Sequence, residues 1–167
     1  DPEAVARLAA QIANAERPAF IVGSDVYWDG AWAELRAAVE ALRVPCFFNG
    51  LGRGLLPADH DLAFLRTRGV LKQRADLVVV LGTPLDFRLG FGRFGNAQVA
   101  HVVDAASQVA NHVDVASVVG DTAQVLRSLA DYAGPRIAHG DWIDELRSAE
   151  SAGRAADQVL LSVADAP

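Results

Sequence analysis

Five short runs of apolar residues recur along the chain, and each ends at a glycine or a polar residue. They are Ala19–Val22, Pro45–Phe48, Leu77–Leu81, Val99–Val103 and Ala116–Val119. A run that is apolar throughout, without alternation, is typical of a strand covered on both faces of a parallel sheet. We therefore predict five buried parallel strands.

Helical patterns lie between these runs. Asp1 and Pro2 are a capping residue and a first-turn proline for a helix on which Val5, Leu8 and Ile12 share a face. Further helices are predicted from Trp32 to Leu42, from Gly69 to Ala75, and after Asp121, which forms a capping-box-like pair with Gln124 and whose helix ends at Gly134-Pro135. Residues 50–67, rich in Gly and Pro, are expected to be irregular.

Alternating strands and helices predict an α/β fold: a doubly wound parallel sheet of five or six strands, Rossmann-like, with helices on both faces. We assign residues 1–135 to this domain. Residues 136–167 differ: a helix starting near Asp141 carries Trp142 and Leu146, and a weakly patterned connector follows it.

Composition narrows the class of protein. The net charge is −6 and Lys72 is the only lysine, which argues against a nucleic-acid partner. No apolar stretch approaches the ~20 residues that cross a bilayer, so no membrane partner is expected. The single cysteine, Cys46, lies in an apolar run and favours a buried thiol and a cytoplasmic protein. The chain has no methionine, which suggests an excised domain or a piece of a longer protein.

The candidate site lies at the strand ends. In a parallel sheet, ligands bind beyond the carboxyl ends of the strands. Small or polar residues follow all five runs: Gly23-Ser24, Asn49-Gly50, Gly82-Thr83, Asp104 and Gly120-Asp121. Glycines let a ligand approach the backbone, a helix N-terminus can bind phosphate, and Asp104 could accept hydrogen bonds from a ribose. The same residues could equally serve only turns and helix caps, and the GxGxxG fingerprint is absent.

Other chemistry-bearing residues favour structural interpretations. The four histidines lack metal-ligand spacing, and His101, within a predicted strand, is expected to be a core residue. Asp86 and Arg88 are expected to pair across their loop. Trp28 and Trp32 suggest a helix-packing stripe. Arg66 and Arg68 could meet phosphate, but the simpler interpretation is solvated surface arginines.

The ordered segments PAFIVGSDV, VPCFFNGLGRGLLPADH, ADLVVVLGTPLDFR, VAHVVDA and VVGD together resemble the central domain of thiamine-diphosphate-dependent enzymes. Within that group they are most similar to acetolactate synthases. The similarity spans about residues 17–132, and its most specific part is GRGLLPADH followed by LGTPLDFR.

The resemblance implies a parent enzyme with three α/β domains, which decarboxylates pyruvate and adds the two-carbon unit to a second 2-oxo acid in branched-chain amino acid biosynthesis. Thiamine diphosphate and Mg²⁺ would be held by N- and C-terminal domains outside this sequence, in a homo-oligomer, and residues 136–167 would lead to the catalytic C-terminal domain. This central domain would be a non-catalytic scaffold.

In the flavin-binding branch of that family, the central domain holds FAD. The matching positions here are Gly23, Ser24, Asn49, Gly50, Arg68, Gly69, Gly82, Thr83, Pro84, Asp86, Arg88, Asp104, Gly120 and Asp121. Two positions depart from the family pattern: Arg66-Thr67-Arg68-Gly69 replaces Gly-Met-His-Gly, and Pro84 replaces an arginine. Related branches bind ADP there, or nothing. The alternative function is a free-standing, non-catalytic module that binds FAD, ADP or NAD.

Overall fold

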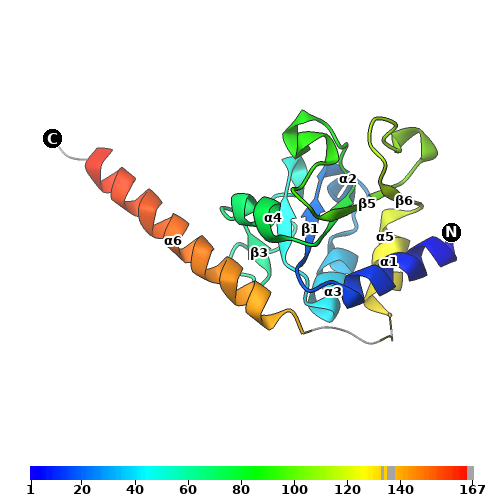
Figure 1. The fold of residues 1–167 in the computed structure, drawn as a ribbon, viewed down its shortest axis with the longest axis horizontal. Coiled ribbons are helices and arrows are strands. Elements are labelled where there is room, and N and C mark those ends of the chain that lie inside the picture. Colours follow the sequence, from blue (N-terminus) through cyan, green and yellow to red (C-terminus); the bar gives the residue numbers. More distant parts are fainter. Residues whose placement is uncertain (133, 135–137, 165–167) are drawn as a thin grey trace.

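Six parallel strands form the centre of the molecule in a computed structural model that describes residues 1–132, 134 and 138–164 (Figure 1). The sheet order is β3-β2-β1-β4-β5-β6, and each neighbouring pair is parallel. The strands are β1 (Pro18–Val22), β2 (Cys46–Phe48), β3 (Ala63–Phe64), β4 (Leu77–Leu81), β5 (Gln98–Val103) and β6 (Ala116–Val119). The predicted parallel α/β sheet is confirmed.

The direction in which strands are added reverses next to β1. Phe20 of β1 is paired with Cys46 of β2 on one side and with Val79 of β4 on the other. The chain builds outward from β1 through β2 to β3, then crosses back to β4 and builds the other way. This is the order of doubly wound dinucleotide-binding sheets, whose ligand crevice lies at such a reversal.

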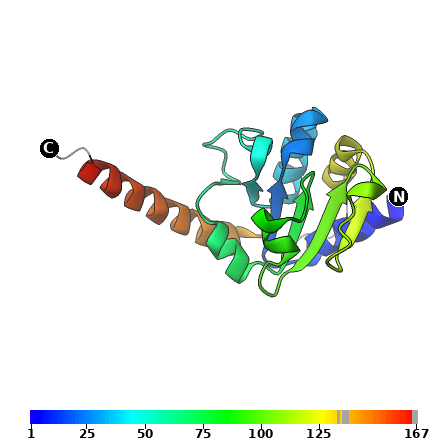
Figure 2. The ribbon, with the colours of Figure 1, turned by 90° about the horizontal axis from the view of Figure 1, so that it is seen from above.

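Helices cover both faces of the sheet. Figure 2 shows α3 (Trp32–Leu42) and α5 (Thr122–Ala130), which pack against each other, on one side, and α4 (Arg68–Arg74) on the other. Helix α1 (Pro2–Asn14) packs against α5. Every residue of β1, β2 and β4 is buried, as their unbroken apolar sequences predict.

The predicted helix starts and the buried cysteine are confirmed. The Asp1 carboxylate accepts from the Glu3 backbone N–H at 2.9 Å, and that of Asp121 accepts from the Gln124 N–H at 2.7 Å. Cys46 is fully buried, and burial raises the pKa of its thiol, so the thiol stays neutral and unreactive. Helix α5 ends at Ala130, earlier than predicted, and Pro135 lies outside the described residues.

Residues 50–67 hold no long regular element, as predicted, but they do contain a 3-10 turn, η1 (Gly50–Gly52), and the edge strand β3, whose two residues are too few to show a periodic pattern. Residues 151–164, which the sequence left weakly patterned, are helical and form the second half of α6 (Gly140–Ala164), because small and polar residues there form helix without an apolar stripe. That they connect to another domain stays a prediction. None of the helices among the described residues is long and apolar enough to cross a membrane.

The helix-packing role predicted for Trp28 and Trp32 was wrong, since 70% and 54% of these residues are exposed. Their spacing of four suggested one helical face. Trp28 instead ends a separate short helix, α2 (Ser24–Trp28), and Trp32 begins α3. The turn at Gly30 between the two helices breaks the stripe.

Helix α6 contacts the rest of the domain from its start as far as Asp157, and its end projects beyond the sheet (Figure 1). Ile143 and Leu146 are buried, and the Trp142 Nε1–H donates to the Pro18 carbonyl at 3.0 Å. Glu150 is 8% exposed and accepts from the Leu65 N–H, just past edge strand β3. The helix therefore protects that edge of the sheet from pairing with another strand.

Candidate functional site

The residues that directly follow β1, β2 and β4 contact one another at the carboxyl edge of the sheet. A Cβ atom on Gly23 would lie 2.2 Å from the Thr83 Cβ and 2.4 Å from the Gly82 carbonyl oxygen. The Asn49 Nδ2–H donates to the Thr83 Oγ1 at 3.2 Å, across the end of β1. The close approach of these segments to one another therefore explains Gly23 without a ligand.

Ser24 and Gly50 also serve this packing. The Ser24 Oγ accepts from the Leu51 N–H at 3.1 Å. Gly50 has a φ of 53°, and a Cβ there would come within 2.5 Å of the same hydroxyl oxygen. Both glycines, Gly23 and Gly50, are thus explained by close approach of the chain to itself.

The start of α2 is unsuited to phosphate. The Asp25 N–H already donates to the Gly82 carbonyl at 3.0 Å. Burial, and then the charge of Asp104, raise the pKa of Asp25, while burial, Asp104 and Asp25 raise that of Asp29. These three carboxylates would repel a phosphate group.

The Asp104 Oδ1 is already hydrogen-bonded to Thr122 and is therefore not free to bind a ribose. This oxygen accepts from the Thr122 N–H at 3.1 Å and from the Thr122 Oγ1–H at 2.7 Å, so it stabilises the start of α5. Gly120 donates its N–H to the Val103 carbonyl at 2.9 Å, and Asp121 caps α5. The contacts of Asp104, Gly120 and Asp121 are therefore those of turns and helix caps, which was the alternative to a ligand site.

Asp86 and Arg88 form the ion pair that the sequence predicts. The Arg88 Nε–H donates to the Asp86 Oδ2 at 3.0 Å, and Arg88 holds the pKa of that carboxyl below its usual value. The guanidinium also lies 5.9 Å from the ring centroid of Phe87, whose side chain is exposed. Asp86 also caps the 3-10 segment η2 (Phe87–Gly92), since its Oδ1 accepts from the Arg88 N–H at 2.9 Å.

A hollow of about 430 Å³ beyond β2 and β3 gathers aromatic and cationic side chains. Its lining residues are Phe47, Phe48, Arg53, Phe64, Leu65, Arg66 and Arg68. Sequence reasoning missed Arg53; the signal was GLGRG directly after a strand.

Arg68 is the predicted site residue best placed to meet a ligand. It is half-buried, and its only described hydrogen bond donates from Nη2 to the Phe48 carbonyl at 3.1 Å. Burial, and then the positive charge of Arg53, lower the pKa of Arg68. The neighbouring Thr67 Oγ1 is buried without a hydrogen-bond partner. An anion would neutralise this cationic pair, so the residues fit the diphosphate of a nucleotide. Gly69 follows with open space around its Cα.

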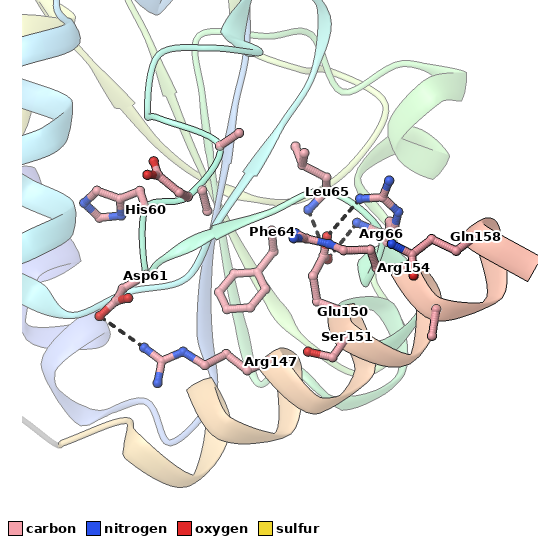
Figure 3. Close-up of a pocket in the computed structure, with 14 residues that line it drawn as sticks. His60, Asp61, Phe64, Leu65, Arg66, Arg147, Glu150, Ser151, Arg154 and Gln158 are labelled. Carbon is pink, nitrogen blue, oxygen red and sulfur yellow. Dashed lines mark hydrogen bonds and ion pairs between the residues drawn. The ribbon is translucent and has the colours of Figure 1, made fainter.

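A second hollow, of about 810 Å³, lies between residues 58–66 and α6 (Figure 3). Here Arg66 is tied to α6: its Nε–H donates to the Asp157 Oδ2 at 2.7 Å, and its backbone N–H donates to the Glu150 Oε2 at 2.9 Å. Arg147 pairs with Asp61 at 3.3 Å on the other side. The prediction of solvated surface arginines is confirmed for Arg66, which is exposed although it is also ion-paired, and is wrong for Arg68, which is half-buried.

Residues 5–129 match the family model described as "Thiamine pyrophosphate enzyme, central domain". The chain belongs to this family. It is 37% identical over 155 residues to the acetolactate synthase large subunit IlvG of Mycobacterium tuberculosis, and 32% identical over 157 residues to 2-hydroxyacyl-CoA lyase 2 of Homo sapiens.

These alignments cover most of the chain but little of the relatives. They span 91% of the chain and 28% of the mycobacterial protein, and 89% and 25% for the human one. The chain thus spans about a quarter of the length of the relatives it matches. Among solved structures, benzoylformate decarboxylase from Polynucleobacter necessarius superposes with a TM-score of 0.69 at 23% identity, over 85% of this chain and 29% of that one. A putative thiamin diphosphate-dependent enzyme from Mycobacterium smegmatis gives 0.68 at 24%, over 83% and 29%. Both likenesses establish the fold.

His101 should make stability depend on pH. It is fully buried in β5, its Nε2–H donates to the Thr83 carbonyl at 2.9 Å, and burial lowers its pKa. The native state therefore takes up a proton less readily than the unfolded chain, so native stability is lost as the pH falls below about 6.5. We expect up to about 1.4 kcal/mol per pH unit from this group, measured by urea unfolding between about pH 7 and pH 5. The variant His101→Gln should show a shallower slope, with His139, another buried histidine of lowered pKa, contributing the remainder. Equal slopes in the two proteins would contradict the assignment.

Proposed function

We propose that this chain is the non-catalytic central domain of a thiamine-diphosphate-dependent enzyme of the acetolactate synthase type. The observation that carries the proposal is the match of residues 5–129 to the central-domain family, together with 37% identity to an acetolactate synthase subunit. The proposed parent enzyme decarboxylates pyruvate and joins the two-carbon unit to a second 2-oxo acid.

The cofactor chemistry is assigned to other parts of that enzyme. Thiamine diphosphate supplies the group that stabilises a carbanion next to a carbonyl. Among the described residues there is no group of three or more His, Cys, Asp or Glu side chains that could hold a metal ion. The domain's own part is to hold its neighbours in place.

The second part of the proposal concerns a ligand. Arg68 and Arg53, beside the aromatic side chains of the β2–β3 hollow, would bind the diphosphate of FAD or of ADP. The residues that follow β1, β2 and β4 contact one another, so they are explained without a dinucleotide across the reversal point itself. The free-standing module is less favoured, because the matched relatives are about four times as long as this chain.

The test uses the full-length protein and two separate measurements. With thiamine diphosphate and Mg²⁺, we expect acetolactate to form from pyruvate. Cleavage of a 2-hydroxyacyl-CoA without turnover of pyruvate would instead favour the activity named for the human relative.

Ligand binding is measured by calorimetry with FAD and with ADP. We expect Arg68→Gln to weaken binding roughly tenfold or more, since it removes a charge-assisted contact to phosphate. Arg7→Gln is the matched control, because Arg7 is exposed on α1 and its ion pairs among the described residues are with Asp1 and Glu3. Equal affinities of the two variants, or no heat with either ligand, would contradict the ligand proposal and leave the enzyme assignment standing.

A further inference from the structure

One face of α6 presents unpaired polar side chains to the hollow between α6 and edge strand β3. Ser151, Arg154 and Gln158 are three and four residues apart, so they share a helix face, and all three line this hollow of about 810 Å³. Figure 3 shows Arg154 and Gln158 extending from the helix toward residues 64–66. No ion pair or hydrogen bond joins these three side chains to another of the described residues. We call Ser151, Arg154 and Gln158 the donor rim.

Most of the charge in the hollow is already compensated. The Glu150 carboxylate meets the Arg66 guanidinium at 3.5 Å, and Arg147 pairs with Asp61 at 3.3 Å. Of the three arginines in the lining, Arg154 alone has no carboxylate partner among the described residues. Its guanidinium is therefore available to an anion.

The remaining acidic side chain of the lining lies on the opposite wall. Asp59 is two residues before Asp61, which holds Arg147. Arg154 is seven residues beyond Arg147, about 10 Å farther along the helix axis. An anion at Arg154 therefore binds toward the other end of the hollow from the Arg147–Asp61 pair.

Apolar surface adjoins the donor rim. Leu65 also lines the hollow and is 52% exposed, and Ala155 is exposed on the α6 side. The buried Phe64 lies behind them, and Figure 3 shows its ring between Arg147 and Glu150. An apolar group that covers Leu65 removes this side chain from water, which favours binding in proportion to the area covered.

The surrounding charges favour a ligand with a single negative charge. Glu150 and Asp157 lie about one helical turn from Arg154 on either side, and both already pair with Arg66. A second negative charge, as on a phosphate, finds no further unpaired arginine in the lining. A carboxylate, by contrast, can accept two parallel hydrogen bonds from one guanidinium.

We propose that the hollow between α6 and β3 binds a monocarboxylate with an apolar body. Its carboxylate pairs with Arg154, and its body covers Leu65. The volume of about 810 Å³ is in the range of small-molecule sites. The inference goes beyond the proposed function and does not depend on it, because no residue of the donor rim belongs to the candidate nucleotide site.

Calorimetry on the full-length protein tests the class of ligand. The probes are octanoate, octanamide, which has the same length without the charge, and inorganic phosphate, which has charge without an apolar body. We expect octanoate to bind roughly tenfold or more tightly than octanamide, and phosphate to give no heat. Equal affinity for octanoate and octanamide, or no heat with octanoate, would overturn the proposal.

Three variants of the same protein locate the site. Arg154→Gln should weaken octanoate roughly tenfold and leave octanamide unchanged, because only the ion pair is lost. Leu65→Ser should weaken both probes, and it keeps the backbone N–H that donates to Glu150. Arg93→Gln is the matched control, because Arg93 is exposed and likewise has no ion pair among the described residues. Equal octanoate affinities of Arg154→Gln and Arg93→Gln would refute the site.

Two further measurements separate lost binding from lost structure. Without octanoate, Arg154→Gln should unfold at the same urea midpoint as the unmodified protein, because Arg154 has no described partner to lose. With octanoate, amide hydrogen exchange should slow at Leu65, Arg66 and residues 151–158, since the ligand joins both walls of the hollow. Protection by octanoate confined to other parts of the protein would contradict the placement.

Discussion

Gly23→Ala is expected to destabilise the domain by about 3 kcal/mol or more, or to prevent folding. The added Cβ would lie 2.2 Å from the Thr83 Cβ and 2.4 Å from the Gly82 carbonyl oxygen. The backbone cannot easily retreat, because the Gly23 N–H donates to the Leu81 carbonyl at 2.8 Å within the sheet. Urea unfolding followed by tryptophan fluorescence measures the loss, since Trp142 is buried in the native state.

Gly69→Ala is the matched control. Gly69 lies in the first turn of α4, and a Cβ there would have no atom within 4 Å. Alanine should therefore be neutral or stabilise the helix by up to about 1 kcal/mol. Both glycines are candidate ligand-site residues by sequence, so the pair separates a packing requirement from a ligand requirement. An unfolding midpoint unchanged by Gly23→Ala would show that the strand tips are not in this close contact.

Glu150→Ala is expected to cost about 2 kcal/mol or more and to release α6 from the edge of the sheet. One carboxylate oxygen accepts from the Leu65 and Arg66 N–H groups at 3.2 and 2.9 Å, and the other meets the Arg66 guanidinium at 3.5 Å (Figure 3). Removing it leaves two backbone donors and a cation without their acceptor. Amide hydrogen exchange at Leu65 and Arg66 should then accelerate, alongside the fall in urea midpoint.

Two further variants bracket this effect. Glu150→Gln keeps an acceptor oxygen and should fall between the alanine variant and the unmodified protein. Asp144→Asn, on the same helix, removes a solvent-exposed partner of Arg147 and should cost well under about 1 kcal/mol. If Asp144→Asn were as destabilising as Glu150→Ala, the loss of stability would come from removing negative charge on α6 in general, and not from losing the hydrogen bonds of Glu150 to Leu65 and Arg66.

The core strands could be predicted from the sequence because a strand that is buried on both faces has an unbroken run of apolar residues. Leu77–Leu81 was predicted with the bounds that β4 has, since an unbroken apolar run has few other uses at that length. Strand β3 could not be predicted in this way, because two residues are too few to show a pattern. The Glu150 carboxylate, which accepts from the N–H of Leu65 directly after the strand, lies 86 residues or more along the chain from Ala63 and Phe64.

The location of the candidate site could be predicted from the sequence, but the contacts within it could not. Parallel strands must bring their carboxyl ends to one edge, so Gly23, Asn49 and Thr83 were expected to meet, and they do. Whether such residues face a ligand or one another depends on distances of a few ångströms between loops, which no local pattern records. Two contacts of this kind are the pairing of Asp104 with Thr122 across neighbouring segments and the hydrogen bond of Arg68 to the Phe48 carbonyl rather than to a carboxylate of the described residues.

The length of α6 has a consequence for whatever follows Ala164. A continuous helix transmits position: each residue advances its end by about 1.5 Å and turns it by about 100°. Deleting one residue of the helix after Asp157 would rotate the chain that follows by more than a quarter of a circle, while the contacts of Glu150 and Asp157 with Arg66 stay in place. The number of residues in α6 thus sets both the position and the rotation of the chain that follows it. Substitutions that keep this number should be tolerated far better than insertions or deletions.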